Sequence, residues 1–155
     1  MKLTLIAVGT KMPSWVQDGY QEYAKRLPKE LCPKLIELNI GARGKNRSVE
    51  QARLQEAQSI QQVIPRSAVV IALDVLGKRL KTEQLANKIS DWQMQGDDVC
   101  LLIGGPDGLT SEVLSSARER WSLSDLTLPH PLVRIVVIEQ LYRAWTVLQN
   151  HPYHK

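Results

Sequence analysis

The chain has 155 residues, of which 43% are hydrophobic and 23% charged, with a formal net charge of +4 and a pI near 9.2. This length predicts one domain, residues 1–155, that buries about two thirds of the surface of its unfolded chain. The composition excludes a disordered or low-complexity chain, and no apolar run approaches the roughly 18 residues of a membrane span. We therefore expect a cytoplasmic globular protein without membrane contact, whose basic balance is compatible with a polyanionic partner.

The first half of the chain is predicted to alternate strands with helices. Ser48 and Gln51 have the spacing of a capping box, which predicts that a helix begins there. Pro65 then ends this helix at about residue 63. The elements predicted before it are a strand at 2–8, a helix at 13–27 and a strand at 35–40.

The second half continues the same alternation. The β-branched run "SAVVIALD", residues 67–74, is typical of a central parallel strand that is covered on both faces. "DVCLLIGG" repeats this pattern, with Cys100 as a small buried residue rather than a disulfide partner. Thr82 and Thr110 are expected to cap helices. The remaining predicted elements are a short helix to about residue 118, a last strand at 123–128 and a final helix from Pro131.

Strict alternation predicts an α/β fold with a mostly parallel sheet flanked by helices, in which a ligand binds beyond the carboxyl ends of the strands. Three loops follow predicted strands there, namely "LDVLGK", "GGPDG" and "LTLPHP". The sequence contains no dinucleotide-binding glycine fingerprint, phosphate-binding loop, nucleophile elbow or zinc-protease motif. No residues have metal-ligand spacing, so we expect no metal. "GGPDG" is compatible with a binding loop or with a simple turn.

His130 stands between two prolines directly before the final predicted helix. Pro131 suits the first turn of a helix and disfavours helical conformation in the residue before it, so we expect His130 to be extended at the helix boundary. The positive end of the helix dipole should keep a partly buried His130 neutral near pH 7. A stiff structural bend is the alternative interpretation of this motif.

The glycine-containing segment "GARGKNR" carries one of the basic clusters of the chain. Arg43, Lys45 and Arg47 are flanked by glycines, which favours a loop that contacts RNA phosphates. Ordinary solvated surface charge is the alternative interpretation of the cluster.

Several motifs together resemble those of the ribosomal large subunit methyltransferase H family of the SPOUT superfamily. They are "KLTLIAVGTKMPSWV", "LDVLGK", "LLIGGPDG", "WSLSDLTLPHPLVR", "EQLYRAW" and "NHPYHK". The resemblance covers nearly the whole chain. It implies a C-terminal trefoil knot, a homodimer, and transfer of a methyl group from S-adenosyl-L-methionine to N3 of a pseudouridine. The implied substrate is 23S rRNA in the stem-loop that bridges the subunits of the assembled 70S ribosome.

The resemblance also implies a cofactor site built largely from backbone groups of the three loops. Glycines and tight turns are what such a site needs, and Gly105→Val is expected to fill the pocket while sparing the fold. The residues implied in this site are Leu73, Gly104, Gly105, Leu123, Ser124, Asp125, Leu126, Thr127 and Leu128.

His130, Tyr153 and His154 resemble the polar active-site residues of the family, and any of them could orient the base or accept its proton. In the family the tail of one protomer reaches the cofactor pocket of its partner. Lys155 is then a candidate for phosphate contact. Arg134 and Arg143 on the final helix are candidates for RNA or dimer contacts, or for ordinary surface ion pairs.

Two other functions are compatible with the sequence. One is a non-catalytic RNA- or ribosome-binding protein that keeps the fold without methyl transfer. The other is a flavodoxin-like α/β domain that binds a different nucleotide and is a monomer.

Overall fold

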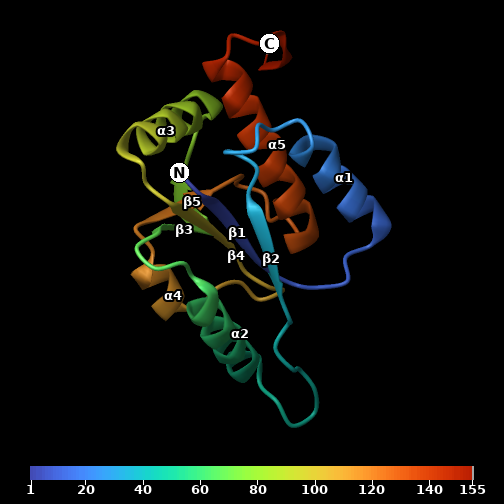
Figure 1. Cartoon of the computed structure of the whole chain (residues 1–155). Helices are drawn as coiled ribbons and strands as arrows, with labels where there is room; N and C mark the ends of the chain where they lie inside the picture. The colour runs from blue at the N-terminus through green and yellow to red at the C-terminus, as the bar shows by residue number, and fades with distance from the viewer. Residues whose placement is uncertain (155) are drawn as a thin grey trace.

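A five-stranded, all-parallel sheet forms the centre of the computed structural model, which describes residues 1–154. The strand order is β2-β1-β4-β3-β5, with helices on both faces (Figure 1). The elements are β1 (Leu3–Val8), α1 (Ser14–Ala24), β2 (Lys34–Leu38), α2 (Val49–Val63), β3 (Val69–Arg79), α3 (Thr82–Gln95), β4 (Val99–Ile103), α4 (Ser111–Ser116), β5 (Glu119–Ser122), α5 (His130–Leu148) and the 3-10 helix η1 (Pro152–His154).

The sheet is buried because each face carries its own hydrophobic core. Successive side chains of a strand point to opposite faces, so Leu5 of β1 joins one core and Ile6 joins the other. The larger core lies beneath α1, α3 and α5, and the smaller one lies beneath α2 and α4. Every residue of β1 and β4 is buried, as their continuous apolar runs predict. The predicted α/β class with a parallel sheet is confirmed, and the trefoil knot stays a prediction.

Helix starts follow local sequence signals in α2 and α4. Ser48 Oγ accepts a hydrogen bond from the Gln51 backbone N–H at 3.1 Å, and the Gln51 side chain accepts one from the Ser48 N–H at 3.1 Å. The predicted capping box is therefore confirmed, and so is the cap at Thr110. Thr82 does not cap α3, because Lys81 is the N-cap residue. The Thr82 hydroxyl instead donates to Gln140 Oε1 of α5 at 2.8 Å.

The last strand lies earlier than predicted. β5 is Glu119–Ser122, whereas the predicted residues 123–128 form an irregular loop. Trp121 is the reason, because its ring is buried and stacks on Trp92 with ring centroids 6.0 Å apart. The apolar side chains of 123–128 have no such partner layer, and Leu126 is 73% exposed.

β3 is longer than predicted and is interrupted by a bulge. Leu73 and Lys78 both pair with Trp121 of β5, so the residues between them loop out of the ladder. Leu76 in this bulge is 89% exposed. Gly77 closes the bulge, where a Cβ atom would lie 2.7 Å from the backbone carbon of Arg120. Within residues 1–154, no helix is both long enough and apolar enough to cross a membrane.

Candidate active site

A cavity of about 560 Å³ opens at the carboxyl ends of β3, β4 and β5. Its walls come from the β3 bulge, the "GGPDG" loop after β4 and the loop between β5 and α5. This is the edge of a parallel α/β sheet at which ligands bind. The three loops that the sequence places after strands therefore meet in one pocket.

All but one of the predicted cofactor residues line this cavity. The exception is Asp125, whose exposed carboxylate points to Arg79 and pairs with its guanidinium at 2.7 Å. The residues that do line the cavity are Leu73, Gly104, Gly105, Leu123, Ser124, Leu126, Thr127 and Leu128. The bulge residues 74–76 also line it, and they belong to the predicted "LDVLGK" loop although they were not named individually. Arg53 of α2 lines it as well and was not predicted.

The glycines allow the "GGPDG" loop to fold back on itself. Gly105 and Gly108 form an isolated antiparallel bridge, and Gly108 has a φ of +78°. A Cβ atom on Gly104 would lie 2.9 Å from the Gly108 carbonyl carbon. The tight fold leaves backbone groups at the cavity wall, as a site made largely of backbone requires.

Gly105 has a different packing role from the predicted one. A Cβ atom there would lie 3.0 Å from Val8 Cγ1 and 3.1 Å from Glu56 Oε1, both behind the loop. The expectation that Gly105→Val fills the pocket while sparing the fold is therefore wrong. A valine would press into the core and against a buried carboxylate, so its effect would report packing rather than ligand binding.

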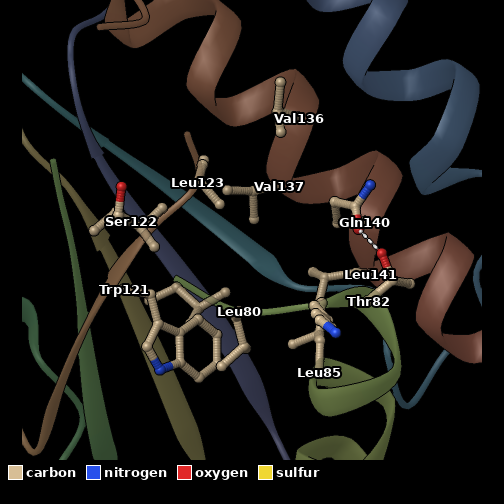
Figure 2. Close-up of a pocket in the computed structure, with 13 residues that line it drawn as sticks. Leu80, Thr82, Leu85, Trp121, Ser122, Leu123, Val136, Val137, Gln140 and Leu141 are labelled. Atoms are coloured by element: carbon tan, nitrogen blue, oxygen red, sulfur yellow. Dashed lines mark hydrogen bonds between the residues drawn. The ribbon is translucent and has the colours of Figure 1, made fainter. Parts of the chain in front are cut away.

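A second cavity of about 410 Å³ lies beneath α3 and α5 (Figure 2). It shares Leu73, Trp121, Ser122 and Leu123 with the first cavity, so the two spaces adjoin at the ends of β3 and β5. Thr82 and Gln140 both line this second cavity, and Figure 2 shows the hydrogen bond between them. None of the "GGPDG" residues lines this cavity.

His130 lines the first cavity as the first residue of α5. Pro129 is the N-cap with extended dihedrals, φ −66° and ψ 145°, so Pro129 takes the extended conformation that was expected of His130. Pro131 lies in the first turn as predicted. Burial lowers the pKa of His130, the nearby Arg134 charge lowers it further, and Glu56 opposes this shift. The expected direction toward a neutral ring is confirmed, although burial and Arg134 now account for it.

The His130 ring lies close to Gly9, where there is no room for a side chain. Gly9 has a φ of +132°, and a Cβ atom on it would lie 2.9 Å from His130 Cε1. The Nδ1 atom of His130 is buried and has no hydrogen-bond partner among residues 1–154. A buried ring nitrogen without a partner is available to a ligand or an ordered water.

Tyr153 and His154 lie at the opposite end of α5. The Tyr153 hydroxyl donates to Glu139 Oε1 at 3.1 Å, and its ring meets Tyr142 edge-on with centroids 4.6 Å apart. Tyr142 is about 18 Å along the helix axis from His130 at 1.5 Å per residue. Figure 1 shows the red segment that follows α5 beyond the end of this helix, away from the helix start. One chain therefore does not bring the three predicted catalytic residues together.

The predicted RNA-binding arginines differ in accessibility. Arg134 is only 2% exposed, and its guanidinium pairs with Glu37 at 2.6 Å and donates to the Gly9 carbonyl at 3.3 Å. Its predicted surface role is therefore wrong, because the side chain is enclosed between α5 and the ends of β1 and β2. Arg43 is also committed to protein carboxylates, Glu56 and Asp107.

The other basic candidates remain closer to solvent. Lys45 and Arg47 are exposed around the Gly44–Arg47 bridge. Arg143 pairs with Glu139 at 2.6 Å, and its Cζ atom lies 4.9 Å from the centroid of the Tyr153 ring. Arg143 therefore packs against the C-terminal segment that contains Tyr153. Lys155 lies outside the described residues. Among residues 1–154, no group of three or more His, Cys, Asp or Glu side chains could hold a metal ion.

Comparison with known proteins identifies the family. A family model described as "Predicted SPOUT methyltransferase" matches residues 1–154. The chain belongs to this family. Relatives called "Ribosomal RNA large subunit methyltransferase H" are 62% identical in Saccharophagus degradans, over 100% of both chains, and 54% identical in Hydrogenovibrio crunogenus, over 100% of this chain and 99% of the relative. The protein is thus a SPOUT methyltransferase of the large subunit methyltransferase H group.

Solved structures agree with this SPOUT fold. A probable methylase family protein from Haemophilus influenzae superposes with a TM-score of 0.57 at 15% identity, over 99% of this chain and 70% of that one. A putative methylase family protein from Neisseria gonorrhoeae gives a TM-score of 0.55 at 11% identity, over 91% and 81% of the two chains. At these identities the likeness concerns the fold alone.

Proposed function

We propose that this SPOUT methyltransferase transfers a methyl group from S-adenosyl-L-methionine to N3 of a pseudouridine in 23S rRNA. The proposed substrate is the intersubunit stem-loop of the assembled 70S ribosome, and the proposed enzyme is a cytoplasmic homodimer. One observation carries the proposal: the 560 Å³ cavity unites all predicted cofactor residues except Asp125 with His130. The names of the relatives, which specify ribosomal RNA of the large subunit, support the substrate class.

The cavity suits a nucleoside-containing ligand. Backbone N–H and C=O groups of the folded-back "GGPDG" loop and of residues 123–128 are available to hold an adenine edge, and Leu73 and Leu126 offer apolar contacts for its faces. When bound, S-adenosylmethionine supplies a methyl group on a positively charged sulfur. The residues around it contribute orientation, because in-line placement of the acceptor nitrogen lowers the barrier.

His130 is our candidate for the group that accepts the N3 proton. His130 lines the cavity, its pKa is lowered, and its buried Nδ1 has no protein partner among residues 1–154. A neutral imidazole can accept a proton directly or through one water. Tyr153 and His154 would act from the partner protomer, because their own chain holds them at the far end of α5. Lys45, Arg47 and Lys155 are our candidates for RNA phosphate contacts.

The decisive experiment is transfer of a labelled methyl group to 70S ribosomes that lack this modification, followed by nucleoside analysis of the 23S rRNA. We expect N3-methylpseudouridine as the product. Isolated 50S subunits and ribosomes that already carry the mark serve as controls. If the protein binds the cofactor but gives no product on active ribosomes, the proposed 23S rRNA substrate is wrong.

Two binding measurements separate the proposal from its alternatives. Calorimetric titration with S-adenosylmethionine should show binding, and its absence would favour the non-catalytic RNA-binding protein. Light scattering should show a dimer, whereas a monomer would favour the flavodoxin-like nucleotide-binding domain.

A further inference from the structure

Arg43 connects the basic loop to the loop at the pocket. Its Nη1 atom lies 2.9 Å from Glu56 Oε2 on α2 and donates to the Gly41 carbonyl at 3.0 Å. Its Nε and Nη2 atoms lie 3.0 Å and 2.9 Å from Asp107 Oδ2 in the "GGPDG" loop. One guanidinium therefore links two carboxylates from segments far apart in the sequence, a geometry that the planar fork of arginine allows.

The contacts of Arg43 with Glu56 and Asp107 form a bridge between α2 and the "GGPDG" loop, and Glu56 is its buried end. Its side chain is 3% exposed, and Oε2 also accepts a hydrogen bond from the Gly41 N–H at 2.8 Å. Oε1 is buried behind Gly105 and has no hydrogen-bond partner among residues 1–154. A buried carboxylate needs a cation beside it, and Arg43 supplies that charge. Sequence analysis missed Glu56, although its place among the buried residues Ala52, Ala57 and Ile60 of α2 is unusual for a carboxylate.

A second arginine contacts the chain directly after the "GGPDG" loop. Arg53, three residues before Glu56 on α2, donates from Nη2 to the Leu109 carbonyl at 2.6 Å. Arg43 and Arg53 therefore hold the two ends of the segment 107–109, and Arg53 itself lines the cavity. Asp107 and Leu109 both line the cavity, so displacement of either residue changes its shape.

We infer that Arg43 is a positioning residue for the ligand pocket rather than an RNA contact: it ties the "GGPDG" loop to Glu56 of α2. The inference rests on the proposed function only for the identity of the ligand. It predicts that the basic loop contains two functions, with Arg43 directed inward to the pocket and with Lys45 and Arg47 directed to solvent.

The test compares Arg43→Met with Arg66→Met, which removes an exposed arginine that lines neither cavity. Calorimetric titration with S-adenosylmethionine should give a Kd about tenfold higher for Arg43→Met and an unchanged Kd for Arg66→Met. The KM for ribosomes should stay within about twofold in Arg43→Met at saturating cofactor. A raised KM for ribosomes with an unchanged cofactor Kd would overturn the inference.

A double-mutant cycle distinguishes the bridge from general loss of stability. Asp107→Asn weakens the loop half of the bridge and leaves the pair between Arg43 and Glu56 in place. If Arg43 acts through Asp107, the double variant should bind cofactor about as weakly as Arg43→Met alone. A double variant whose Kd rises by the product of the two single-variant factors would show that Arg43 does not act through Asp107. Arg43→Lys should recover part of the affinity, because an ammonium keeps the charge without the two-sided geometry.

Amide hydrogen exchange gives a readout that needs no ligand. The backbone amides of residues 104, 105 and 107–109 should exchange faster in Arg43→Met than in the wild-type protein, with the amides of the central strands unchanged. Faster exchange in a protein that binds no S-adenosylmethionine would uphold the bridge and refute the proposed function. Unchanged exchange of this loop would refute the bridge itself.

Discussion

At the scale of single residues, the environment of each charged side chain decides its role. Arg43, Lys45 and Arg47 are three basic residues of one short segment, yet only Arg43 meets two carboxylates. Arg134 was a predicted surface contact of the final helix, yet it is enclosed with Glu37. Buried arginines of this kind are held by paired carboxylates that are distant in the sequence. Their pairing therefore does not appear in local charge patterns.

The lowered pKa of His130 predicts a pH dependence of stability. Burial and then the Arg134 charge favour the neutral ring. The unfolded chain therefore binds a proton more readily than the folded protein below the ordinary histidine pKa of about 6.5. This contribution to folding stability is complete above that pH and is lost as the pH falls toward the lowered pKa.

His130→Gln should remove this part of the pH dependence. We expect its free energy of unfolding, measured by urea denaturation, to fall less than that of the wild-type protein between pH 7.5 and pH 5, about one unit or more on either side of the histidine pKa. His151→Gln is the control, because His151 is exposed. An equal fall in the free energy of unfolding with pH for His130→Gln and the wild-type protein would contradict the lowered pKa of His130.

At the scale of elements, α5 carries one predicted catalytic residue, His130, at its start and contacts another, Tyr153, along its second half. Its first residue lines the cavity, and its second half contacts the tail through Glu139, Tyr142 and Arg143. Burial, and then the hydrogen bond to Glu139, raise the pKa of Tyr153 to about 12. The phenol therefore stays protonated and donates across the physiological range.

Substitutions of Tyr153 should separate this hydrogen bond from ring packing. Tyr153→Phe keeps the ring against Tyr142 and should cost about 1 kcal/mol of stability through the lost hydrogen bond. Tyr153→Ala also removes the aromatic contact and should cost about 1 kcal/mol more. Urea denaturation measures both values. An alanine variant as stable as the wild-type protein would mean that the tail is not docked on α5.

At the scale of the whole molecule, one chain separates the tail from the pocket. A site that uses His130 together with Tyr153 or His154 therefore needs a second copy, which agrees with the proposed homodimer. This arrangement predicts complementation between two defective chains, His130→Ala and a chain that ends at Asn150.

Each variant alone should be inactive in methyl transfer, and a mixture assembled by co-expression should regain activity. Random pairing makes half of the dimers mixed, and each mixed dimer has one intact site of two, so about a quarter of wild-type activity is expected. The measurement is labelled methyl transfer to 70S ribosomes, with the two single variants mixed only after purification as a control for slow exchange. A co-expressed mixture without activity would place His130 and the tail at one site within a chain.

Local patterns predicted most of the secondary structure and the place of the pocket. Apolar runs predicted β1 and β4, and the side-chain spacing of Ser48 and Gln51 predicted the start of α2. Strand-end loops in a parallel sheet converge by topology, so the cavity could be expected once the strands were placed. Signals that act over a few residues in the chain are sufficient for these features.

Long-range contacts decided the remaining features. The stacking of Trp121 on Trp92 placed β5 earlier than its apolar pattern suggested. Gly105 lines the pocket with its backbone, but a side chain there would point at Val8 and Glu56. Thr82 bonds Gln140 rather than its own helix end. Alternation, turn chemistry and the caps at Ser48 and Thr110 depend on neighbours in the sequence, and the sequence alone therefore determined them. The direction of a side chain and the partner of a buried charge depend on segments brought together by folding, so only the tertiary structure decided them.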